Sequence, residues 1–399
     1  MSKRILFVDD EPMVLSGLQR SLRLMRTEWE MEFVTGGVEA LQLMEQKSFD
    51  IIVTDMRMPV MTGAQLLEEV KRRFPQCFRI ILSGQADQDT IMRAVDPTHQ
   101  FLAKPCETSE LKRRLGRAFA VRSLLKNKEL QAVVSRLQAL PSLPALYLEV
   151  TRELENPEPS VSRIGQLVSE DMAMTAKILQ LVNSAFFGLR CRVSNAVQAV
   201  QMLGLDTLKA LVLSTHVFDK FRTGILGEAE MMYLWKHSLA VAGYAKQIAV
   251  LESADRQTVD DCFTAGLLHD SGKLILSSAL GNLYQNVLAL VRETGKGLVV
   301  AETEVLGCNH AEIAAYLLGL WGLPEAVIDG VAWHHDPAGS LQSRFSTVIT
   351  THIASIYHER QASSWIQDRT ALDVAYLASI GCTVREETWR QVVQEPTES

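Results

Sequence analysis

Short apolar runs alternate with amphipathic stretches along the amino-terminal part of the chain. The apolar runs are RILFVDD, MEFVT, DIIVTD, RIILSG and QFLAKP, and they begin at Arg4, Met31, Asp50, Arg79 and Gln100. Between them lie GVEALQLMEQ and GAQLLEEVKRRF, in which apolar residues recur at helical spacing. Buried strands separated by helices are typical of a parallel sheet covered on both faces. The pattern therefore predicts an α/β domain with a doubly wound, five-stranded parallel sheet over residues 1–121.

A long helical stretch follows this domain. From Thr108 to Leu140 the chain has no proline, and Gly116 is its one glycine. A single helix of this length would extend about 50 Å at about 1.5 Å per residue. In one interpretation, a linker helix over residues 122–139 continues the last helix of the first domain, and its narrow apolar stripe forms a coiled-coil seam in a homodimer. In the other interpretation, the linker helix is separate.

The remainder of the chain has a helical pattern. Two prolines in LPSLPAL, residues 140–146, interrupt the preceding helix and open a second domain. Beyond them, apolar residues recur at spacings of three and four, and strand signals are absent. Residues 140–399 are therefore predicted to form an all-α domain.

Composition restricts the class of protein. Hydrophobic residues make up 47% and charged residues 22%, which is typical of soluble globular proteins. The six cysteines include no C-x-x-C pair, which argues against a zinc knuckle or a disulfide framework. Acidic residues interrupt the first apolar run, so it does not resemble a signal peptide, and no run approaches the ~18 apolar residues of a membrane span. The net charge of −7 argues against DNA binding. Taken together, these features predict a cytoplasmic location.

Polar residues stand where the predicted strands end. Asp9 and Asp10 follow the first strand, Asp55 ends the third, Ser83 the fourth and Lys104 the fifth. Because the carboxyl ends of parallel strands meet at one edge of the sheet, these side chains are expected to share a pocket. Crowded carboxylates favour Mg²⁺, and a phosphoryl group on Asp55 would find Mg²⁺, a hydroxyl and an ammonium around its oxygens.

Histidines and one aspartate recur through the second domain. Neutral imidazoles and a carboxylate suit a transition metal such as Fe, Mn or Zn, and residues on adjacent helices can meet in a bundle core. Such a metal could activate a water toward a phosphodiester. A single buried histidine is more often a core or capping residue. The candidates are His237, His269, Asp270, His310, His334 and His335.

The first domain resembles the receiver domain of two-component response regulators, which has a flavodoxin-like fold. The motifs that match are VDDE, VTDMRMPVMTG, ILSG and FLAKP, which together are highly specific. The resemblance implies that Asp55 accepts a phosphoryl group from a sensor histidine kinase or a phosphotransfer protein, assisted by Ser83 and Lys104. It implies that Asp9, Asp10, Asp55 and the Arg57 carbonyl hold Mg²⁺. It also implies that Ser83 and Phe101 form the switch pair, and that a cis peptide precedes Pro105.

The second domain resembles the HDOD domain, a relative of the HD-type metal phosphohydrolases. The matching motifs include LPSLPAL, LLHDSGKLIL and the segment from Asn309 to Pro337. By this resemblance the six candidate residues occupy ligand-like positions, and Lys273 occupies the position of a conserved lysine. Most members of the HDOD family have lost metal ligands and bind other proteins.

Two features of the active enzymes are missing from the sequence. Ser355 stands where an aspartate would close the HD signature, and the GYP loop of the cyclic-di-GMP phosphodiesterases is absent after His335. His352 could substitute as a ligand, since it lies one turn before Ser355 on the same helical face. The missing carboxylate favours a weakened mononuclear site, if any.

Two functions remain open. In the first, the protein is a response regulator in which phosphorylation of Asp55 controls an HDOD output that binds a downstream signalling protein. In the second, the output is a metal-dependent phosphodiesterase acting on a cyclic dinucleotide. A transcription regulator is less favoured, because no helix-turn-helix or basic recognition helix is evident.

Overall fold

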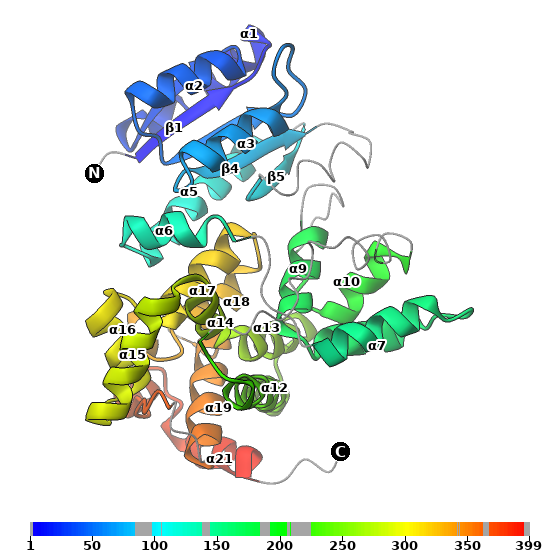
Figure 1. Cartoon of the computed structure of the whole chain (residues 1–399), viewed down its shortest axis with the longest axis vertical. Coiled ribbons are helices and arrows are strands. Elements are labelled where there is room, and N and C mark those ends of the chain that lie inside the picture. The colour runs from blue at the N-terminus through cyan, green and yellow to red at the C-terminus, as the bar shows by residue number, and fades with distance from the viewer. Residues whose placement is uncertain are drawn as a thin grey trace. The chain divides into compact units, whose positions relative to one another are not determined.

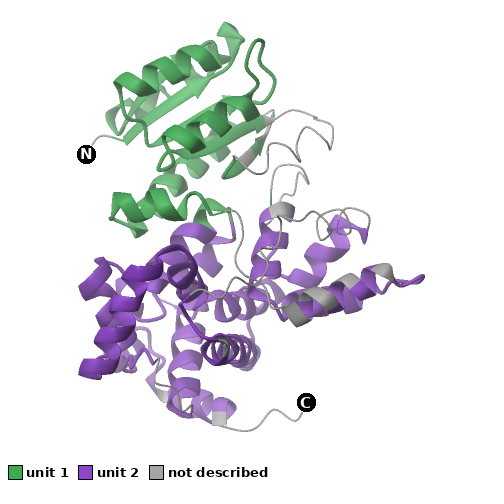
Figure 2. Cartoon of the chain, viewed as in Figure 1, with its two compact units in different colours: residues 1–138, 183–191, 319–322 green, residues 139–182, 192–318, 323–399 purple. Residues whose placement is uncertain are grey.

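The computed structural model divides into two compact units, which Figure 2 colours separately. Unit 1 comprises residues 1–138, 183–191 and 319–322, and unit 2 comprises the rest. The structure describes residues 3–83, 98–104, 106–137, 144–183, 192–205, 208, 225–340, 342, 344–361 and 367–394.

Unit 1 contains a parallel sheet with the strand order β2-β1-β3-β4-β5 (Figure 1). This order confirms the predicted doubly wound, five-stranded α/β fold. The elements in chain order are β1 (Lys3–Val8), α1 (Pro12–Ser21), η1 (Arg23–Thr27), β2 (Trp29–Val34), α2 (Gly37–Gln46), β3 (Ile51–Asp55), α3 (Gly63–Arg73), β4 (Phe78–Ser83), β5 (Gln100–Ala103), α5 (Thr108–Leu124) and α6 (Lys128–Val134).

Helices cover both faces of this sheet because successive strand residues point to opposite sides. On one face, Leu6, Ile52 and Ile81 of the strands share a buried cluster with residues of α2 and α3. On the other face, Trp29 of β2 packs against Phe119 of α5, with 6.0 Å between the ring centroids. The sheet is therefore buried on both sides, as the continuous apolar runs predict.

The predicted continuous helix over 122–139 is not observed. Helix α5 ends at Leu124, Leu125 adopts an extended conformation, and Asn127 caps α6 by accepting the N–H groups of Glu129 and Leu130. Asparagine is a preferred N-cap, so it starts a new helix here rather than continuing the old one.

The apolar stripe that predicted a coiled-coil seam is buried within the chain itself. Leu111, Leu115 and Ala118 of α5 are each at most 1% exposed, and Leu125 is 0% exposed. The part of the stripe in α5 therefore packs within the chain, whereas Val133 of α6 is 36% exposed.

A buried arginine connects the sheet to the end of α6. Arg79 of β4 is 1% exposed, and its guanidinium donates to the Pro75, Cys77 and Ser135 carbonyl oxygens at 3.1–3.2 Å. Its backbone N–H donates to His99 Nδ1 at 3.1 Å, just before β5. Burial and the nearby Arg79 charge hold the pKa of His99 well below its usual value, so this imidazole is neutral. Strands β4 and β5 and the end of α6 thus share one hydrogen-bond network.

The described part of unit 2 contains helices and no strands, which confirms the predicted all-α domain. Its elements are α7 (Pro144–Glu155), α8 (Val161–Ser169), α9 (Met172–Val182), α10 (Ala196–Leu203), α12 (Glu228–Leu251), α13 (Arg256–Leu268), α14 (Ser271–Ala279), α15 (Gly281–Thr294), α16 (Leu298–Leu306), α17 (His310–Leu320), α18 (Glu325–Ala332), η3 (Pro337–Gly339), α19 (Thr347–Gln361), α20 (Val374–Ser379), η4 (Thr383–Arg385) and α21 (Glu386–Gln394).

Helices α12, α13 and α19 form the centre of the larger helical group in unit 2. Val241 and Ile248 of α12, Cys262 of α13 and Ile353 of α19 share an apolar core, which Trp389 of α21 closes. This packing holds together α12, which carries His237, and α13, which ends just before His269.

None of the described helices is, by itself, long and apolar enough to cross a membrane. One pair of helices, Arg256–Ala279 and Gly281–Thr294, meets the length and composition requirements together, but it is bent by 118°.

We predict that Gly63→Ala weakens the sheet edge beneath Asp55. A Cβ atom on Gly63 would lie 2.1 Å from the Asp55 carbonyl oxygen, which is backbone and cannot rotate away. Overpacking of this kind costs about 1–3 kcal/mol. Hydrogen exchange of the β3 peptide in the full chain, measured by mass spectrometry, should become faster.

The matched control is Gly17→Ala in helix α1, where nothing lies within 4 Å of the added Cβ atom. This change should leave β3 protection intact, because alanine is favoured in helices by about 0.5–1 kcal/mol. Unchanged exchange of β3 in Gly63→Ala would show that the turn before α3 is not tightly packed.

Candidate functional sites

Two carboxylates and a lysine meet at the carboxyl edge of the sheet in unit 1. Asp9 follows β1, Asp55 ends β3 and Lys104 follows β5. The Lys104 ammonium lies 2.8 Å from Asp9 Oδ2 and also pairs with Asp55 Oδ1. Asp9 is 2% exposed and Asp55 9% exposed. The structure therefore brings together three of the predicted residues through a shared ion pair.

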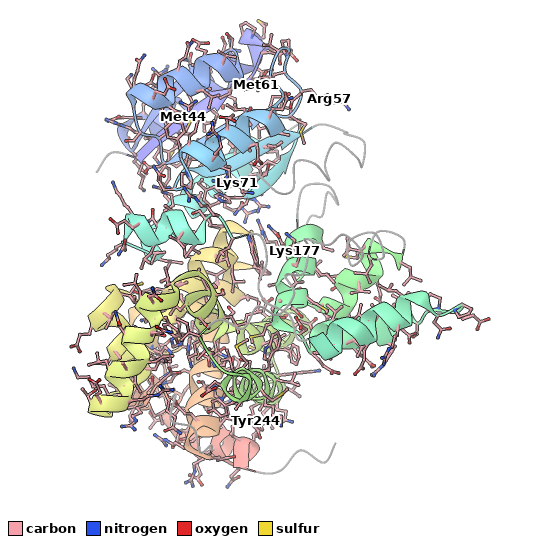
Figure 3. All side chains as sticks on the ribbon, viewed as in Figure 1. Met44, Arg57, Met61, Lys71, Lys177 and Tyr244 are labelled. Atoms are coloured by element: carbon pink, nitrogen blue, oxygen red, sulfur yellow. The ribbon has the colours of Figure 1, made fainter. Side chains whose placement is uncertain are left out.

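Backbone groups also hold these carboxylates. The Glu11 N–H donates to Asp9 Oδ1 at 3.0 Å, and the Arg57 N–H donates to Asp55 Oδ2 at 2.6 Å. The Arg57 side chain is exposed and points away from the sheet (Figure 3), so any role of Arg57 in ion binding has to come from its backbone. Asp10 is next to Asp9 and half-buried, at the same strand end.

The charge on Lys104 is stabilised by its partners. Burial lowers the pKa of this ammonium, but the hydrogen bonds that it donates to Asp55 and Asp9 outweigh burial and raise its pKa above the usual value. Lys104 therefore stays charged next to the oxygen atoms that a phosphoryl group would approach. Carboxylate oxygens at one edge are the donor set that Mg²⁺ prefers.

For the predicted switch pair, Ser83 and Phe101, the structure describes the backbone position in the sheet. Ser83 is the last residue of β4 and pairs with Ala103, and Phe101 of β5 pairs with Ile81. The side chains of Ser83 and Phe101, and the whole of Pro105, lie outside the described residues.

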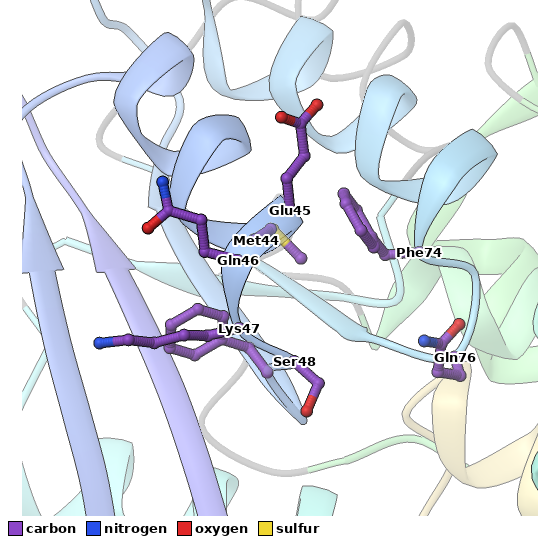
Figure 4. A pocket seen from close by; sticks show the side chains of 8 residues that line it. Met44, Glu45, Gln46, Lys47, Ser48, Phe74 and Gln76 are labelled. Atoms are coloured by element: carbon purple, nitrogen blue, oxygen red, sulfur yellow. The ribbon is translucent and has the colours of Figure 1, made fainter.

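A pocket at the opposite end of the same sheet does not involve these residues (Figure 4). It lies between the ends of α2 and α3, where Met44, Phe49, Phe74 and Gln76 line it. Phe49 precedes β3 and Gln76 precedes β4, so the pocket is at the amino ends of these strands, away from Asp55.

In unit 2, the six candidate residues meet in one buried cluster. His237 comes from α12, and His269 and Asp270 form the junction of α13 and α14. His310 begins α17, while His334 and His335 follow α18. We call these six side chains, together with Asp368, the histidine cluster.

Asp270 lies between two groups of histidines. Its Oδ2 atom is 3.7 Å from His237 Nε2 and 3.5 Å from His269 Nε2, and these two nitrogens are 3.3 Å apart. Its Oδ1 atom is 3.2 Å from His310 Nε2. The two oxygens of one buried carboxylate thus contact different imidazoles.

Asp368 completes the second group. Its carboxylate lies 4.0 Å from His310 Nε2 and 3.8 Å from His335 Nε2, and His335 Nε2 is 2.9 Å from His310 Nε2. Lys273 bridges the two acids, at 2.8 Å from Asp270 and 2.9 Å from Asp368.

The outer nitrogens of the histidines have partners that orient the rings. The Nδ1 atoms of His269 and His334 each lie 2.7 Å from a backbone carbonyl oxygen, of Gly266 and Val331. A carbonyl can only accept, so both Nδ1 atoms carry hydrogen and both Nε2 atoms face the cluster. This is the arrangement that outer hydrogen bonds impose on metal-binding histidines.

The remaining rings follow the same pattern. His310 Nδ1 lies 2.7 Å from Glu302 Oε2, and His335 Nδ1 lies 2.8 Å from Thr370 Oγ1. His237 Nδ1 lies 2.7 Å from His358 Nδ1. Nε2 of each ring is therefore directed toward the acids.

Burial keeps most of these imidazoles neutral. It lowers the pKa of His237, His269, His334 and His335. Neutral imidazole is the form that binds metals.

His310 differs from the other rings of the cluster. Burial lowers its pKa, but the Glu302 and Asp368 carboxylates outweigh burial and raise it to about 10. Burial disfavours ionised Asp270, yet the Lys273 ammonium and the hydrogen bond from His310 hold the pKa of this carboxyl well below its usual value.

Comparison with known families identifies the two units. A model of the response regulator receiver domain matches residues 5–116, and a model of the HDOD domain matches residues 140–337. The chain is a receiver–HDOD protein. Its domain composition is that of a response regulator.

Relatives of the receiver–HDOD protein resemble it over parts of their length. An uncharacterised protein of Treponema pallidum (strain Nichols) is 31% identical over 205 residues, 51% of this chain and 39% of that protein. HoxA, a hydrogenase transcriptional regulatory protein of Cupriavidus necator, is 34% identical over 25% of this chain and 21% of its own. The chain therefore spans less than half of the curated relatives that it matches first.

Solved structures with similar folds include MmoQ, a response regulator of Methylococcus capsulatus str. Bath. It is 23% identical, with a TM-score of 0.47, and the match covers 65% of this chain and 99% of MmoQ. An HDOD domain protein of Geobacter sulfurreducens is 26% identical, with a TM-score of 0.39, over 71% of this chain and 93% of that protein.

The second acid of the histidine cluster comes from a segment that the sequence analysis missed. The expected position, Ser355 in α19, holds no carboxylate, and Asp368 reaches the cluster from outside the helices. The Asp368 N–H donates to Glu359 Oε1, and the Gln367 carbonyl accepts the Leu298 N–H at 2.9 Å. No motif near Asp368 indicates this role. The absence of a carboxylate at Ser355 agrees with the sequence analysis, which did not identify Asp368 as a neighbour of these histidines.

His352 is not a substitute ligand. Its Nδ1 atom lies 2.6 Å from the His334 carbonyl oxygen, and its Nε2 atom accepts the Asp373 N–H at 3.1 Å. Both ring nitrogens are thus used in positioning the segments on either side of the cluster.

We predict that Gly272→Ala disrupts the histidine cluster of the receiver–HDOD protein. A Cβ atom on Gly272 would lie 1.9 Å from the His310 carbonyl oxygen, so α14 would have to move away from α17. The expected cost is about 1–3 kcal/mol or more. The thermal unfolding midpoint, followed by circular dichroism, should fall.

Gly243→Ala in α12 is the control, since nothing lies within 4 Å of its added Cβ atom. It should leave the midpoint unchanged or raise it slightly. Equal midpoints for the two variants would mean that α14 and α17 do not need close contact.

Proposed function

We propose that the protein is a phosphorylation-controlled response regulator in which Asp55 is the phosphoacceptor. The observation that carries this proposal is the shared contact of Asp9 and Asp55 with Lys104 at the carboxyl edge of the sheet. Positioning and charge neutralisation are what phosphoryl transfer mainly requires. The donor is a phosphohistidine of a sensor kinase or phosphotransfer protein.

Each residue of this edge has a defined task in the transfer. An Asp55 carboxylate oxygen forms a bond to phosphorus as the bond from phosphorus to the donor's histidine nitrogen breaks. The Arg57 N–H orients the carboxylate through Oδ2, and the Lys104 ammonium lies next to Oδ1. A Mg²⁺ ion held by Asp9, Asp10, Asp55 and the Arg57 carbonyl would neutralise charge on the phosphoryl oxygens.

The signal then passes to the rest of the receiver through Ser83 and Phe101. Their strands, β4 and β5, are adjacent in the sheet, so a contact made by Ser83 affects the strand that carries Phe101. The output of the HDOD domain is binding of a downstream signalling protein, which phosphorylation promotes or releases.

A second candidate output is hydrolysis of a phosphodiester such as a cyclic dinucleotide. The convergence of five histidines with Asp270 and Asp368 favours it. A divalent transition metal bound there would supply Lewis-acid activation of water. Release of linear dinucleotide from cyclic-di-GMP by the metal-loaded full chain distinguishes this output from protein binding alone.

We predict that Asp55→Asn abolishes labelling of the protein by radioactive acetyl phosphate, because an amide cannot form the acyl phosphate. Asp50→Asn is the matched control. Asp50 immediately precedes β3, so the same residue type is changed at the opposite end of that strand, where Arg122 contacts it at 3.0 Å. The control should retain labelling, and labelling of Asp55→Asn at the wild-type level would refute the assignment.

We predict that labelling also depends on a divalent cation. Chelation by EDTA should abolish it, and added Mg²⁺ should restore it. Asp10→Asn should shift the Mg²⁺ concentration for half-maximal labelling upward, because one oxygen ligand is replaced by a weaker donor. A Mg²⁺ dependence identical to that of the wild type would remove Asp10 from the ion site.

A further inference from the structure

We propose that the solvent-facing side of α12 is a docking surface for an amphipathic helix of a partner protein, one that carries acidic residues beside its apolar face. This inference rests on the proposed protein-binding output of the HDOD domain and assigns a surface to that output. None of the residues that form the surface belongs to the histidine cluster.

The exposed side of α12 has the spacing of a coiled-coil seam. Its residues follow one another at alternating intervals of four and three positions, which places them along one stripe of the helix. The three large apolar residues among them are 38–58% exposed. We call the following six residues the α12 seam: Met232, Lys236, Leu239, Gly243, Lys246 and Val250.

Helix α12 is apolar on both of its sides, which is not the usual pattern of a surface helix. On the inward side, Val241 and Ile248 are 0% exposed and pack in the core with residues of α13, α19 and α21. The side opposite the core normally carries polar residues. On α12 this side instead exposes Leu239 and Val250, with Leu251 next to them. Exposed apolar residues that gather on one surface mark a binding site.

Gly243 leaves an open position in the middle of the α12 seam. A Cβ atom built on Gly243 would have nothing within 4 Å of it. Leu239 lies about one turn before this position and Lys246 about one turn after it. In a pair of packed helices, a side chain of one helix enters such a space on the other. The seam therefore has room for a side chain of a second helix.

Both charges on the α12 seam are positive. Lys236 and Lys246 are exposed, and they are separated by about 15 Å along the helix at about 1.5 Å per residue. The Lys246 ammonium lies 6.0 Å from the centroid of the Phe263 ring. Among the residues that the structure describes, neither lysine pairs with a carboxylate. Carboxylates of a partner helix at this spacing would be complementary to both lysines.

A second copy of this chain does not suit the α12 seam. In a parallel pair of seams, Lys236 would face Lys236 and Lys246 would face Lys246. In an antiparallel pair centred on the seam, Met232 would lie opposite Val250, so Lys236 would face Lys246. Like charges that face one another disfavour an interface. The partner is therefore a different protein, with acidic residues.

A lipid surface also fits the α12 seam less well than a helix does. Helices that lie on membranes present a broad apolar face with Trp, Phe or Leu residues. The seam is a single stripe, and its large apolar residues are Met232, Leu239 and Val250, so it includes no aromatic ring. A stripe of this width matches the seam of one partner helix.

Binding of designed peptides to the full chain tests the proposal. The acidic peptide is a synthetic helix of about three heptads, with leucine at positions a and d and glutamate at positions e and g. The basic peptide has lysine in place of glutamate. Like charges at e and g keep each peptide from pairing with itself. Fluorescence anisotropy measures binding at about 0.15 M salt, which screens long-range attraction. Each measurement is made before and after incubation of the chain with acetyl phosphate and Mg²⁺.

The acidic peptide should bind saturably in at least one of these two states. Lys236→Glu combined with Lys246→Glu should weaken its binding by about tenfold or more and should strengthen binding of the basic peptide, because the charge of the seam is reversed. The matched control is Lys126→Glu combined with Lys128→Glu, which reverses two exposed lysines of unit 1. This control should leave binding of both peptides unchanged.

Leu239→Glu should also weaken the acidic peptide by about tenfold or more, because it puts a carboxylate at the centre of the seam. Leu283→Glu is its control, since Leu283 of α15 is 48% exposed and lies outside the seam. Circular dichroism checks that each variant folds, and Met232→Glu replaces Leu239→Glu if the latter does not.

The proposal is overturned if the acidic peptide fails to bind in both states, or if it binds equally to the wild type and to the charge-reversed seam. A wild-type dimer that Leu239→Glu converts to monomer in sedimentation would assign the seam to a second copy. Binding to vesicles of anionic lipid that Leu239→Glu abolishes would assign it to a membrane. Either result would also overturn the proposal. Labelling by acetyl phosphate is measured on the same samples, so labelled protein that binds no peptide would reject the α12 seam and leave the phosphoacceptor in place.

Discussion

A carboxylate removed from water has to be compensated by its neighbours, and the helical unit is built around one such group, Asp270. It is 0% exposed and contacts Lys273 and the imidazoles of three separate helical segments. The close approach of Gly272 to the His310 carbonyl brings α14 and α17 near enough for these contacts. The receiver applies the same rule on a smaller scale, since Asp9 and Asp55 share the Lys104 ammonium.

The fold and the acidic edge could be predicted because their signals are local. Each apolar run ends directly at the polar residue that it positions, as VDD does at Asp9 and Asp10 and VTD does at Asp55. Parallel pairing then places these ends at one edge, whatever the loops between them do. The histidines of the second domain were selected by residue type and by the resemblance of their motifs to the HDOD family, and the structure brings them together.

Asp368 could not be predicted in this way. It belongs to a segment without helical or strand periodicity. The position of this segment depends on residues far away in the sequence, because Gln367 contacts Leu298 and Thr370 contacts His335. The division of the long helix was similarly hidden. Asn127 is a single capping residue inside an otherwise helical pattern, and its effect depends on Leu125 being buried in an extended conformation. Tertiary contacts, rather than local propensity, decided both features.

The hydrogen bonds of Arg79 have a mechanical consequence for the receiver. Arg79 stands at the start of β4, and its partner His99 precedes β5, whereas Ser83 and Phe101 lie further along these same strands. Ser135, whose carbonyl oxygen also accepts from Arg79, is where the chain leaves α6 toward the second domain. A displacement of β4 or β5 at the acidic edge would therefore be transmitted through Arg79 to the end of α6, where the chain continues into the second domain.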